Sequence, residues 1–499
     1  MTDLTRTSLV LRGGRLLDPG QGLDRPGDLL IEAGRIAAIG AAGTLSGEEV
    51  FQASGLVVCP GFIDVHCHLR EPGFEEKETI ATGTAAAAAG GFTTLCCMPN
   101  TEPPIDRAAV VEYVLKMARI EGMVRVLPIG CITLGRKGEQ LTEMADLAQA
   151  GALAFSDDGS PVASARLMRS ALEYSSMLGV PVIDHCQDPS LSQGAVVHEG
   201  WVSTALGLKG EPAAAEEVMV ERDLALAELT GGWVHIAHVS TAGSVERIRR
   251  AKARGVRVTA EVTPHHLTLT HEWVAGRASL PGVEAWNGWS LFPYDTSTKV
   301  NPPLRTVEDT RALLEGLLDG TIDAIATDHA PHDTPSKLCE YDDAAFGISG
   351  LETALGLLLT LVHSGQMDLG LLVQKLTAGP ARLLGTRNEE QGTGRGQGQG
   401  SGFRVQGSGE GQGSRFRSQG SPEDRGTALD SRPSTLDSRL STLAPGAPAD
   451  IAIFDPEQTW VVDPFRMASK GKNTPLAGLT LRGRVVATIY GGSMVYRCG

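Results

Sequence analysis

Two histidines separated by one residue, His66 and His68, follow an apolar run that predicts a β-strand. Because side chains alternate between the two faces of a strand, both imidazoles are expected on one face, where they can bind the same metal ion. Arg70 lies two residues further on, and its planar guanidinium is suited to binding a carboxylate. The alternative is a pair of histidines at an ordinary strand end, and further metal-binding side chains along the chain decide between the two.

Metal-binding residue types recur where later apolar runs end. One run ends in Asp157 and Asp158, two others end in His185 and His238, and the last ends in Asp328. Histidine and aspartate without thiolate ligands favour zinc or a similar divalent ion. Together with the first pair, these side chains exceed what one tetrahedral ion binds, and a shared carboxylate can bridge two ions about 3.5–4 Å apart. A metal site is therefore the favoured interpretation.

The elements that must position these residues alternate regularly. Eight short apolar runs are separated by segments with helical periodicity, such as residues 78–89, 107–120 and 216–229. This alternation predicts the α/β class and a (β/α)8 TIM-like barrel over residues 57–385, with its chemistry at the carboxyl ends of the strands. A doubly wound open sheet is the alternative, but eight evenly spaced units favour closure. The predicted strands span residues 57–65, 93–98, 124–129, 152–155, 180–183, 233–237, 256–262 and 322–326.

The two ends of the chain predict a second, smaller unit. Residues 1–56 and 445–499 both contain short strand patterns broken by glycine-rich turns. We expect these ends to form one small β-sandwich beside the barrel. The expected strands lie at residues 9–12, 28–31, 35–39, 446–454, 485–490 and 494–496.

Residues 386–444 differ in composition from the rest of the chain. They consist largely of Gly, Ser, Gln and Arg. Such a segment buries too little apolar area to offset its ordering entropy, so we predict a disordered tether. Contact of its arginines with an acidic partner is the less favoured alternative, because the charges nearly balance.

The composition limits the class of protein. A chain of 499 residues with a formal net charge of −15 lacks the basic character that nucleic-acid binding requires. No apolar run approaches the ~18 residues that span a bilayer, and the first residues do not resemble a signal peptide. The eight cysteines are scattered without a CxxC pair. We therefore expect no disulfide framework, no membrane contact and a reducing, cytoplasmic location.

The remaining histidines are interpreted more conservatively. His265 and His266 follow the seventh predicted strand, and because the ligand set is already complete we expect them to make hydrogen bonds around the site. His198, His271 and His363 lie in helical or loop contexts and receive no role.

Six short motifs of this sequence occur together in one known family. They are HCHLREPG at 66–73, MPNT at 98–101, SDDG at 156–159, NPPLR at 301–305, ATDHAPH at 326–332 and FGI at 346–348. On these motifs the chain resembles the bacterial-type dihydroorotases of the amidohydrolase superfamily, over nearly everything except the low-complexity segment. The resemblance implies reversible ring closure of N-carbamoyl-L-aspartate to (S)-dihydroorotate, the third step of pyrimidine biosynthesis.

The resemblance also implies a ligand set for two zinc ions. His66, His68 and Asp328 would bind one ion, His185 and His238 would bind the second, and a carboxylate would bridge the two. Many relatives use a carboxylated lysine as the bridge, whereas the matching residue here is Asp158, as in one branch of the dihydroorotases. Asp157 is the competing choice for this bridge.

The substrate contacts follow from the same resemblance. Arg70 and Asn100, helped by His332, would bind the substrate carboxylate, and Asn301 would contact the pyrimidine ring. Asp328 would act as the catalytic base, taking a proton from the attacking water and handing it to the ring nitrogen. The substrate-binding residues implied in this way are His68, Arg70, Asn100, Asn301, His332, Phe346 and Gly347.

Two readings compete with a dihydroorotase. A hydantoinase-like or allantoinase-like enzyme would share the metals but would not need Arg70 for a substrate carboxylate. A non-catalytic scaffold subunit of aspartate transcarbamoylase would have lost metal ligands, and none is missing here. A homodimer and a complex with aspartate transcarbamoylase are both compatible with the resemblance, and the sequence does not decide between them.

One further segment departs from the family pattern. Residues 273–294 form an insertion that contains Trp286 and Trp289 and precedes Asn301. It is able to cover the active site or a subunit contact, and the sequence gives no physical basis for choosing.

Overall fold

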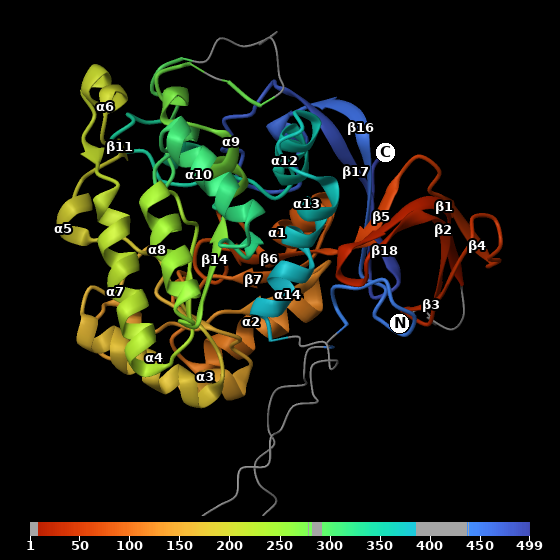
Figure 1. The fold of residues 1–499 in the computed structure, drawn as a ribbon, viewed down its shortest axis with the longest axis horizontal. Helices are drawn as coiled ribbons and strands as arrows, with labels where there is room; N and C mark the ends of the chain where they lie inside the picture. The colour runs from red at the N-terminus through yellow and green to blue at the C-terminus, as the bar shows by residue number, and fades with distance from the viewer. Residues whose placement is uncertain (1–7, 278, 282–291, 386–436, 438) are drawn as a thin grey trace, which may run out of the picture.

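Parallel strands form the centre of the computed structural model. The residues described are 8–277, 279–281, 292–385, 437 and 439–499. A three-stranded and a five-stranded parallel sheet are joined at both edges by single bridges, Gly130 to Phe155 and Cys67 to His329. These bridges close an eight-stranded barrel, so the predicted (β/α)8 fold is confirmed (Figure 1). The barrel strands are β6 (Phe62–Cys67), β7 (Phe92–Cys97), β8 (Arg125–Pro128), β9 (Phe155–Ser156), β10 (Val182–Asp184), β13 (Val234–Ile236), β14 (Val258–Val262) and β15 (Ala324–Ile325).

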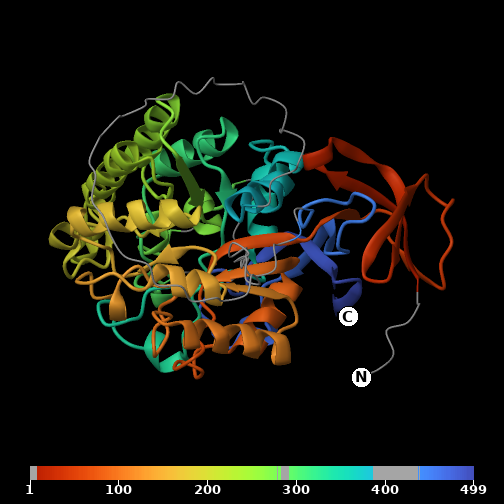
Figure 2. The ribbon, with the colours of Figure 1, turned by 90° about the horizontal axis from the view of Figure 1, so that it is seen from below.

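Helices form the outer layer of the barrel (Figures 1 and 2). Every residue of β6 is buried, because one face of the strand packs inside the barrel and the other packs beneath the helices. Ile63, Val65 and Ile183 belong to the interior cluster, and Leu383 joins it from the last helix before the low-complexity segment. The helices of this layer are α1 (Ile80–Ala89), α2 (Ala108–Glu121), α3 (Met144–Ala150), α4 (Ala165–Leu178), α7 (Ala214–Thr230), α8 (Ala242–Ala253), α10 (Val307–Leu318), α12 (Ala354–His363), α13 (Leu369–Leu376) and α14 (Ala378–Leu383).

The loops that follow β10, β14 and β15 contain short helices and strands. Two of them, β11 and β12, pair as a small parallel ribbon between β10 and α7. The short elements are α5 (Pro189–Ser192), β11 (Val197–His198), α6 (Trp201–Leu206), β12 (Gly210–Glu211), α9 (Pro264–Thr268) and α11 (Thr334–Lys337).

The first predicted strand, residues 57–65, is wrong as a single element. The strand is interrupted at Gly61. As a result, β5 (Val57–Pro60) pairs with strands from the chain ends, whereas β6 is the first strand of the barrel. The Gly61 amide donates to the carbonyl of Asp450. A Cβ on Gly61 would lie 2.2 Å from Oγ1 of Thr93, so this crossing leaves no room for a side chain. One continuous apolar run thus serves two sheets.

Strands from both chain ends form a single eight-stranded sheet beside the barrel (Figure 1). The order is β18-β17-β16-β5-β1-β2-β3, with β4 paired to β1. One apolar core that contains Leu16, Ile36 and Ile453 belongs to this sheet, and the strands form one continuous sheet. The remaining strands are β1 (Leu9–Asp18), β2 (Leu23–Glu32), β3 (Arg35–Gly40), β4 (Glu49–Gln52), β16 (Ile451–Val461), β17 (Thr480–Tyr490) and β18 (Ser493–Arg497).

The predicted disordered segment, residues 386–444, extends too far at its carboxyl end. Leu440 and Leu443 are buried, and Leu443 belongs to the core of the terminal sheet. The Leu443 amide and the Thr442 hydroxyl both donate to the carboxylate of Asp18. The prediction of disorder for residues 386–436 lies outside the described residues, as do Trp286 and Trp289 of the insertion.

The structure agrees with the absence of a disulfide framework. All eight cysteines are free thiols, and six of them are buried. Within the described ranges, no helix combines the length and the apolar character that a membrane span requires.

Candidate metal centre and substrate pocket

Six predicted ligands meet at the carboxyl rim of the barrel. They come from five strand ends, and all six side chains are buried. His238 and Asp328 have positive φ angles of 32° and 45°, which are unusual for residues other than glycine. Strained backbone of this kind persists where the surroundings hold it, and it concentrates at active sites. The six residues are His66, His68, Asp158, His185, His238 and Asp328.

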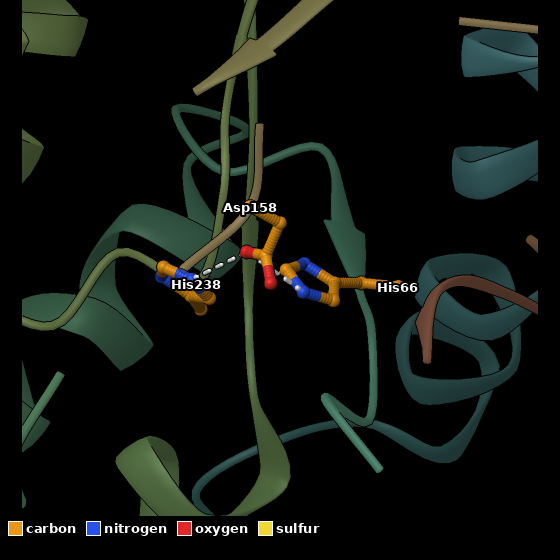
Figure 3. A group of neighbouring side chains, drawn as sticks. All are labelled: His66, Asp158 and His238. Atoms are coloured by element: carbon orange, nitrogen blue, oxygen red, sulfur yellow. Dashed lines mark ion pairs between the residues drawn. The ribbon is translucent and has the colours of Figure 1, made fainter. Parts of the chain in front are cut away.

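Asp158 lies at the centre of the first group (Figure 3). Its Oδ1 is 3.4 Å from Nε2 of His66, 3.6 Å from Nε2 of His238 and 3.7 Å from Nδ1 of His185. Burial alone would raise the pKa of this carboxyl group. The charge of His66 and the nearby imidazoles outweigh burial and hold the pKa of Asp158 well below its usual range. The carboxylate is therefore ionised and available to a cation.

Asp328 is the centre of the second group. Its Oδ1 lies 2.9 Å from Nε2 of His68 and 3.5 Å from Nε2 of His66. Nε2 of His68 is also 3.6 Å from Oδ2 of Asp158, so the two groups share His66 and lie side by side. Burial opposes ionisation here as well, but the hydrogen bond from His68 lowers the pKa of Asp328.

The geometry of these groups fits a divalent metal. Nε2 of His66 and Oδ1 of Asp158 are buried without a hydrogen-bond partner among the described residues, although both are polar. With metal–ligand bonds of about 2.0–2.1 Å, two ligands of a tetrahedral ion lie roughly 3.3–3.4 Å apart. The 3.4–3.7 Å separations around Asp158 match that spacing. The donor set of imidazoles and carboxylates therefore suits a divalent ion.

Partners outside the cluster fix which imidazole nitrogen faces it. Nδ1 of His66 donates to Glu261 at 2.6 Å, which leaves Nε2 free to face Asp158. Although burial would raise the pKa of Glu261, His66 lowers it to about 2. Nε2 of His185 donates in the same way to Gln187 at 3.3 Å. Outer hydrogen bonds of this kind orient metal-binding histidines.

Sequence reasoning missed Glu261 and Gln187. Glu261 is a carboxylate inside the apolar strand β14, and this buried charge in a barrel strand was the available signal. Gln187 follows His185 by two residues and exchanges two amide hydrogen bonds with Asn301, at 2.9 and 3.2 Å. It therefore links a metal-facing histidine to a predicted substrate residue.

The structure separates the two neighbouring aspartates after β9. The carboxylate of Asp157 accepts hydrogen bonds from the amides of Ile132 and Thr133 and from the Thr133 hydroxyl, so it faces away from the histidines. Burial raises its pKa to about 6. Asp158 is the one that faces the cluster.

The predicted carboxylate-binding residues lie beside the metal-facing groups. Nη2 of Arg70 is 3.3 Å from Nε2 of His332, and that nitrogen donates to the carbonyl of Phe346 at 2.8 Å. Nδ1 of His68 lies 2.9 Å from the side-chain amide of Asn100. Arg70 has a φ of 64°, again in the left-handed region. The structure thus gathers a guanidinium, an imidazole and an amide at one edge of the cluster.

The residues predicted to contact the pyrimidine ring begin beside this group, because the Phe346 carbonyl accepts a hydrogen bond from His332. Asn301 and Phe346 line an open depression of about 540 Å³ together with Gln187 and Lys209. The Gly347 amide donates to the Lys299 carbonyl at 2.9 Å. Of the predicted substrate residues, Asn301 and Phe346 border this depression.

The other histidines behave in two ways. His266 bonds to Thr263 and to the Pro302 carbonyl, as expected for a residue that supports the site. His265 is buried, and its Nε2 has no hydrogen-bond partner among the described residues. Nδ1 of His198 lies 3.2 Å from Arg305, away from the cluster.

A third group of acidic side chains lies behind β10. Asp184, Cys186 and Asp223 have ligand atoms within 4.8 Å of one another. Arg222 lies 3.4 Å from Asp184 and 2.6 Å from Asp223, so one guanidinium pairs with both carboxyl groups. This group is a buried ion-pair network.

Comparison with known proteins agrees with the geometry. A family model described as Dihydro-orotase-like matches residues 55–244. Proteins named Dihydroorotase from Pelotomaculum thermopropionicum and Syntrophus aciditrophicus are 51% and 46% identical to this chain over 488 and 491 residues. These matches cover 98% of this chain and 98% and 99% of the two relatives. The chain belongs to the dihydroorotase family.

Solved structures with the same fold carry related names. L-Hydantoinase (dihydropyrimidinase) from Arthrobacter aurescens superimposes with a TM-score of 0.77 at 23% identity, covering 99% of this chain and 97% of that one. Dihydropyrimidinase from Brevibacillus agri gives 0.73 at 20% identity, covering 98% and 95%. At these identities the likeness shows the fold. As a member of the dihydroorotase family, the chain is a metal-dependent cyclic amidohydrolase.

Proposed function

We propose that this chain catalyses the reversible hydrolysis of (S)-dihydroorotate to N-carbamoyl-L-aspartate in pyrimidine biosynthesis. The observation that carries the proposal is the position of Arg70 and His332 beside a buried His/Asp cluster. A guanidinium at that edge supplies charge-assisted hydrogen bonds to a substrate carboxylate. Family membership at about half identity over nearly the full chain supports the same reaction.

The proposed cofactor is zinc, with two ions per chain. His66, His68 and Asp328 would hold one ion, His185 and His238 would hold the other, and Asp158 would bridge them. Imidazole and carboxylate ligands without thiolates suit zinc. When bound, such ions lower the pKa of water and polarise a carbonyl oxygen.

Two sets of residues would orient the substrate, one at its carboxylate and one at its ring. Arg70 and Asn100 would bind the carboxylate, with His332 beside them, while Asn301 and the backbone of Phe346 and Gly347 would bind the ring. His68, which bonds to Asn100, would link this pocket to the metal side. Held in this way, the ring carbonyl would lie beside the residues proposed to bind the metal ions.

Asp328 is the proposed catalytic base. Its carboxylate is buried and its pKa is lowered, so it is ionised at neutral pH and accepts the proton of the attacking water at Oδ. As the new C–O bond forms and the ring C–N bond breaks, Asp328 returns that proton to the departing nitrogen. Ring closure follows the same steps in reverse, with release of water.

Two other functions remain distinguishable by experiment. A hydantoinase-type enzyme would act on uncharged rings, which a half-buried guanidinium at the pocket would not help to bind. A non-catalytic scaffold of aspartate transcarbamoylase would not need all six metal-facing residues. Homodimer formation and association with a transcarbamoylase are compatible with the proposed reaction and form no part of its chemistry.

Activity assays on the purified chain test the proposal directly. We expect turnover of dihydroorotate and cyclisation of N-carbamoyl-L-aspartate, about two zinc ions per chain, and loss of both activities after chelation. Dihydrouracil and hydantoin are the neutral controls. Turnover of these rings without turnover of dihydroorotate would identify a hydantoinase, and a fully metal-loaded chain without activity would identify a scaffold.

A further inference from the structure

Between β16 and β17, two strands of the sheet formed by the chain ends, the chain returns to the barrel rim. Following β16, residues 469–473 pack against the loop that comes after β15. Ser469 donates to Glu78 through its hydroxyl at 2.5 Å, and the Lys470 amide donates to the same carboxylate at 3.2 Å. A Cβ on Gly471 would lie 2.4 Å from Cβ of Pro331, so the two backbones are in close contact. This segment is therefore fixed on the rim from two sides.

Asn473 makes four side-chain hydrogen bonds, all to two loops of the barrel rim. Its Nδ2 donates to the carbonyls of Ala330 at 3.0 Å and Gly347 at 2.9 Å. Its Oδ1 accepts from the His332 amide and from the Ser349 hydroxyl, both at 2.9 Å. The amide is buried and uses both of its donors and two acceptor positions. Two carbonyls on one side and an amide on the other fix its orientation.

The two loops that Asn473 joins carry the proposed substrate contacts. His332 donates from Nε2 to the Phe346 carbonyl at 2.8 Å, which links the loops a second time. Arg70 donates from Nε to the Pro331 carbonyl at 3.2 Å. A shift of the backbone at residues 330–332 would therefore move both the imidazole and the guanidinium.

We propose that Asn473 is a positioning residue that holds the carboxylate-binding groups of the substrate pocket in place. The inference rests on the proposed dihydroorotase reaction. It extends that proposal to a residue that contacts none of the six proposed metal ligands and is not proposed to contact the substrate. Asn473 sets the spacing between the loop of His332 and the loop of Phe346 and Gly347, and through Pro331 it fixes Arg70. The pocket is thus completed by a segment more than 100 residues further along the chain than these loops.

The chemistry of the side chain makes the proposal specific. The substitution Asn473→Asp would keep the size and the acceptor for the His332 amide, but it would point a carboxylate oxygen at the carbonyls of Ala330 and Gly347. Two donors would be lost and replaced by repulsion. The loops are then expected to separate while the metal-facing residues, which Asn473 does not contact, keep their positions.

The experiment compares Asn473→Asp with the parent, both loaded with zinc. We expect KM for dihydroorotate to rise roughly 10- to 100-fold, a cost similar to that of losing the outer partner of a metal ligand, while zinc content is unchanged and kcat falls less than about threefold. Ser349→Ala removes one of the four bonds and is expected to raise KM about two- to fivefold. Thr488→Val is the control, because the buried Thr488 hydroxyl in β17 donates to the Ala88 carbonyl in α1, away from the residues that Asn473 contacts. Its KM is expected to equal that of the parent.

The outcomes separate positioning from general stabilisation. A KM within twofold of the parent in zinc-loaded Asn473→Asp overturns the inference, as does a parallel loss of zinc and kcat. If Asn473→Asp does not fold, Ser349→Ala decides, and an unchanged KM there overturns the inference too. A parent without dihydroorotate turnover would instead contradict the proposed function itself.

Discussion

In the proposed mechanism Asp328 is both a metal ligand and the proton acceptor. The hydrogen bond from His68 keeps this buried carboxylate ionised, and an amide at the same position could not accept a proton. We expect Asp328→Asn to lower dihydroorotate hydrolysis by about 10²- to 10⁴-fold, the usual contribution of general acid–base catalysis. Zinc content should fall much less, because an amide oxygen can still bind the metal. The measurement pairs kcat with metal analysis of the same sample.

A metal-facing histidine provides the comparison for Asp328. His238→Ala removes an imidazole beside Asp158 and should lower zinc content and activity together. Activity of metal-verified Asp328→Asn within a few-fold of the parent would assign the proton transfer to another group, and His332 would be the next candidate.

The state of His332 makes a prediction about pH. Burial and the neighbouring Arg70 lower the pKa of His332 to about 2, far below its usual value. The imidazole is then neutral from about pH 3 upwards and carries no charge that could change between pH 5.5 and 8.5. KM for dihydroorotate, measured across that range at constant ionic strength, should show no break near pH 6.5. A KM that rises as pH increases through 6.5 would mean that a charged His332 binds the carboxylate.

The position of a single site residue was predictable where its spacing along one strand end determines which way its side chain faces. His66 and His68 follow from alternation at the end of β6, and the later ligands follow from the rim of the barrel. Glu261 and Asn473 were not predictable in this way, because their partners are distant in sequence. The choice between Asp157 and Asp158 depends on the direction of a loop after β9, which residue spacing does not encode.

At the scale of elements, β5 and β6 show that one apolar run in the sequence can form two separate strands. Residues 57–65 are almost all apolar, so periodicity gives one strand, and only the Pro60–Gly61 pair hints at a break. The break is needed because β5 hydrogen-bonds to β16 whereas β6 hydrogen-bonds to β7. The eight barrel units were predictable because each strand is followed by a helix with its own periodicity.

The close packing at this break predicts a cost for any side chain at Gly61. The added methyl group of Gly61→Ala would meet Thr93 at 2.2 Å in a fully packed interior. Overpacking of this kind costs typically about 1–3 kcal/mol, so the free energy of unfolding should fall by that amount in chemical denaturation. Gly200→Ala is the control, because its Cβ would meet no atom closer than 3.8 Å and its φ of 169° is extended. Equal stability of the two variants would show that Thr93 can move aside.

At the scale of the whole molecule, the two chain ends and the barrel form one structure. The terminal sheet contains strands from before and after the barrel, and the Arg125 side chain of the barrel pairs with Asp450 of the sheet at 2.9 Å. The sequence predicted that the ends meet, because both contain short strand patterns. It did not predict that residues 469–473 reach back to the active-site rim, since no periodicity marks that contact.

This organisation predicts opposite outcomes for two changes near the carboxyl end. Replacing residues 390–435 with a flexible Gly/Ser linker of about 20 residues should leave kcat/KM and stability close to the parent values, because every metal-facing and substrate-facing residue lies outside them. The cut must end before Asp437, which pairs with Arg35, and before the buried Leu440. Stopping the chain at residue 445 should instead abolish activity, because it removes β16, β17, β18 and Asn473. Activity and thermal unfolding of both proteins check the prediction. An insoluble or inactive linker variant would show that residues 390–435 contribute to packing or assembly. An active chain that stops at residue 445 would show that the barrel rim is complete without the carboxyl-terminal segment.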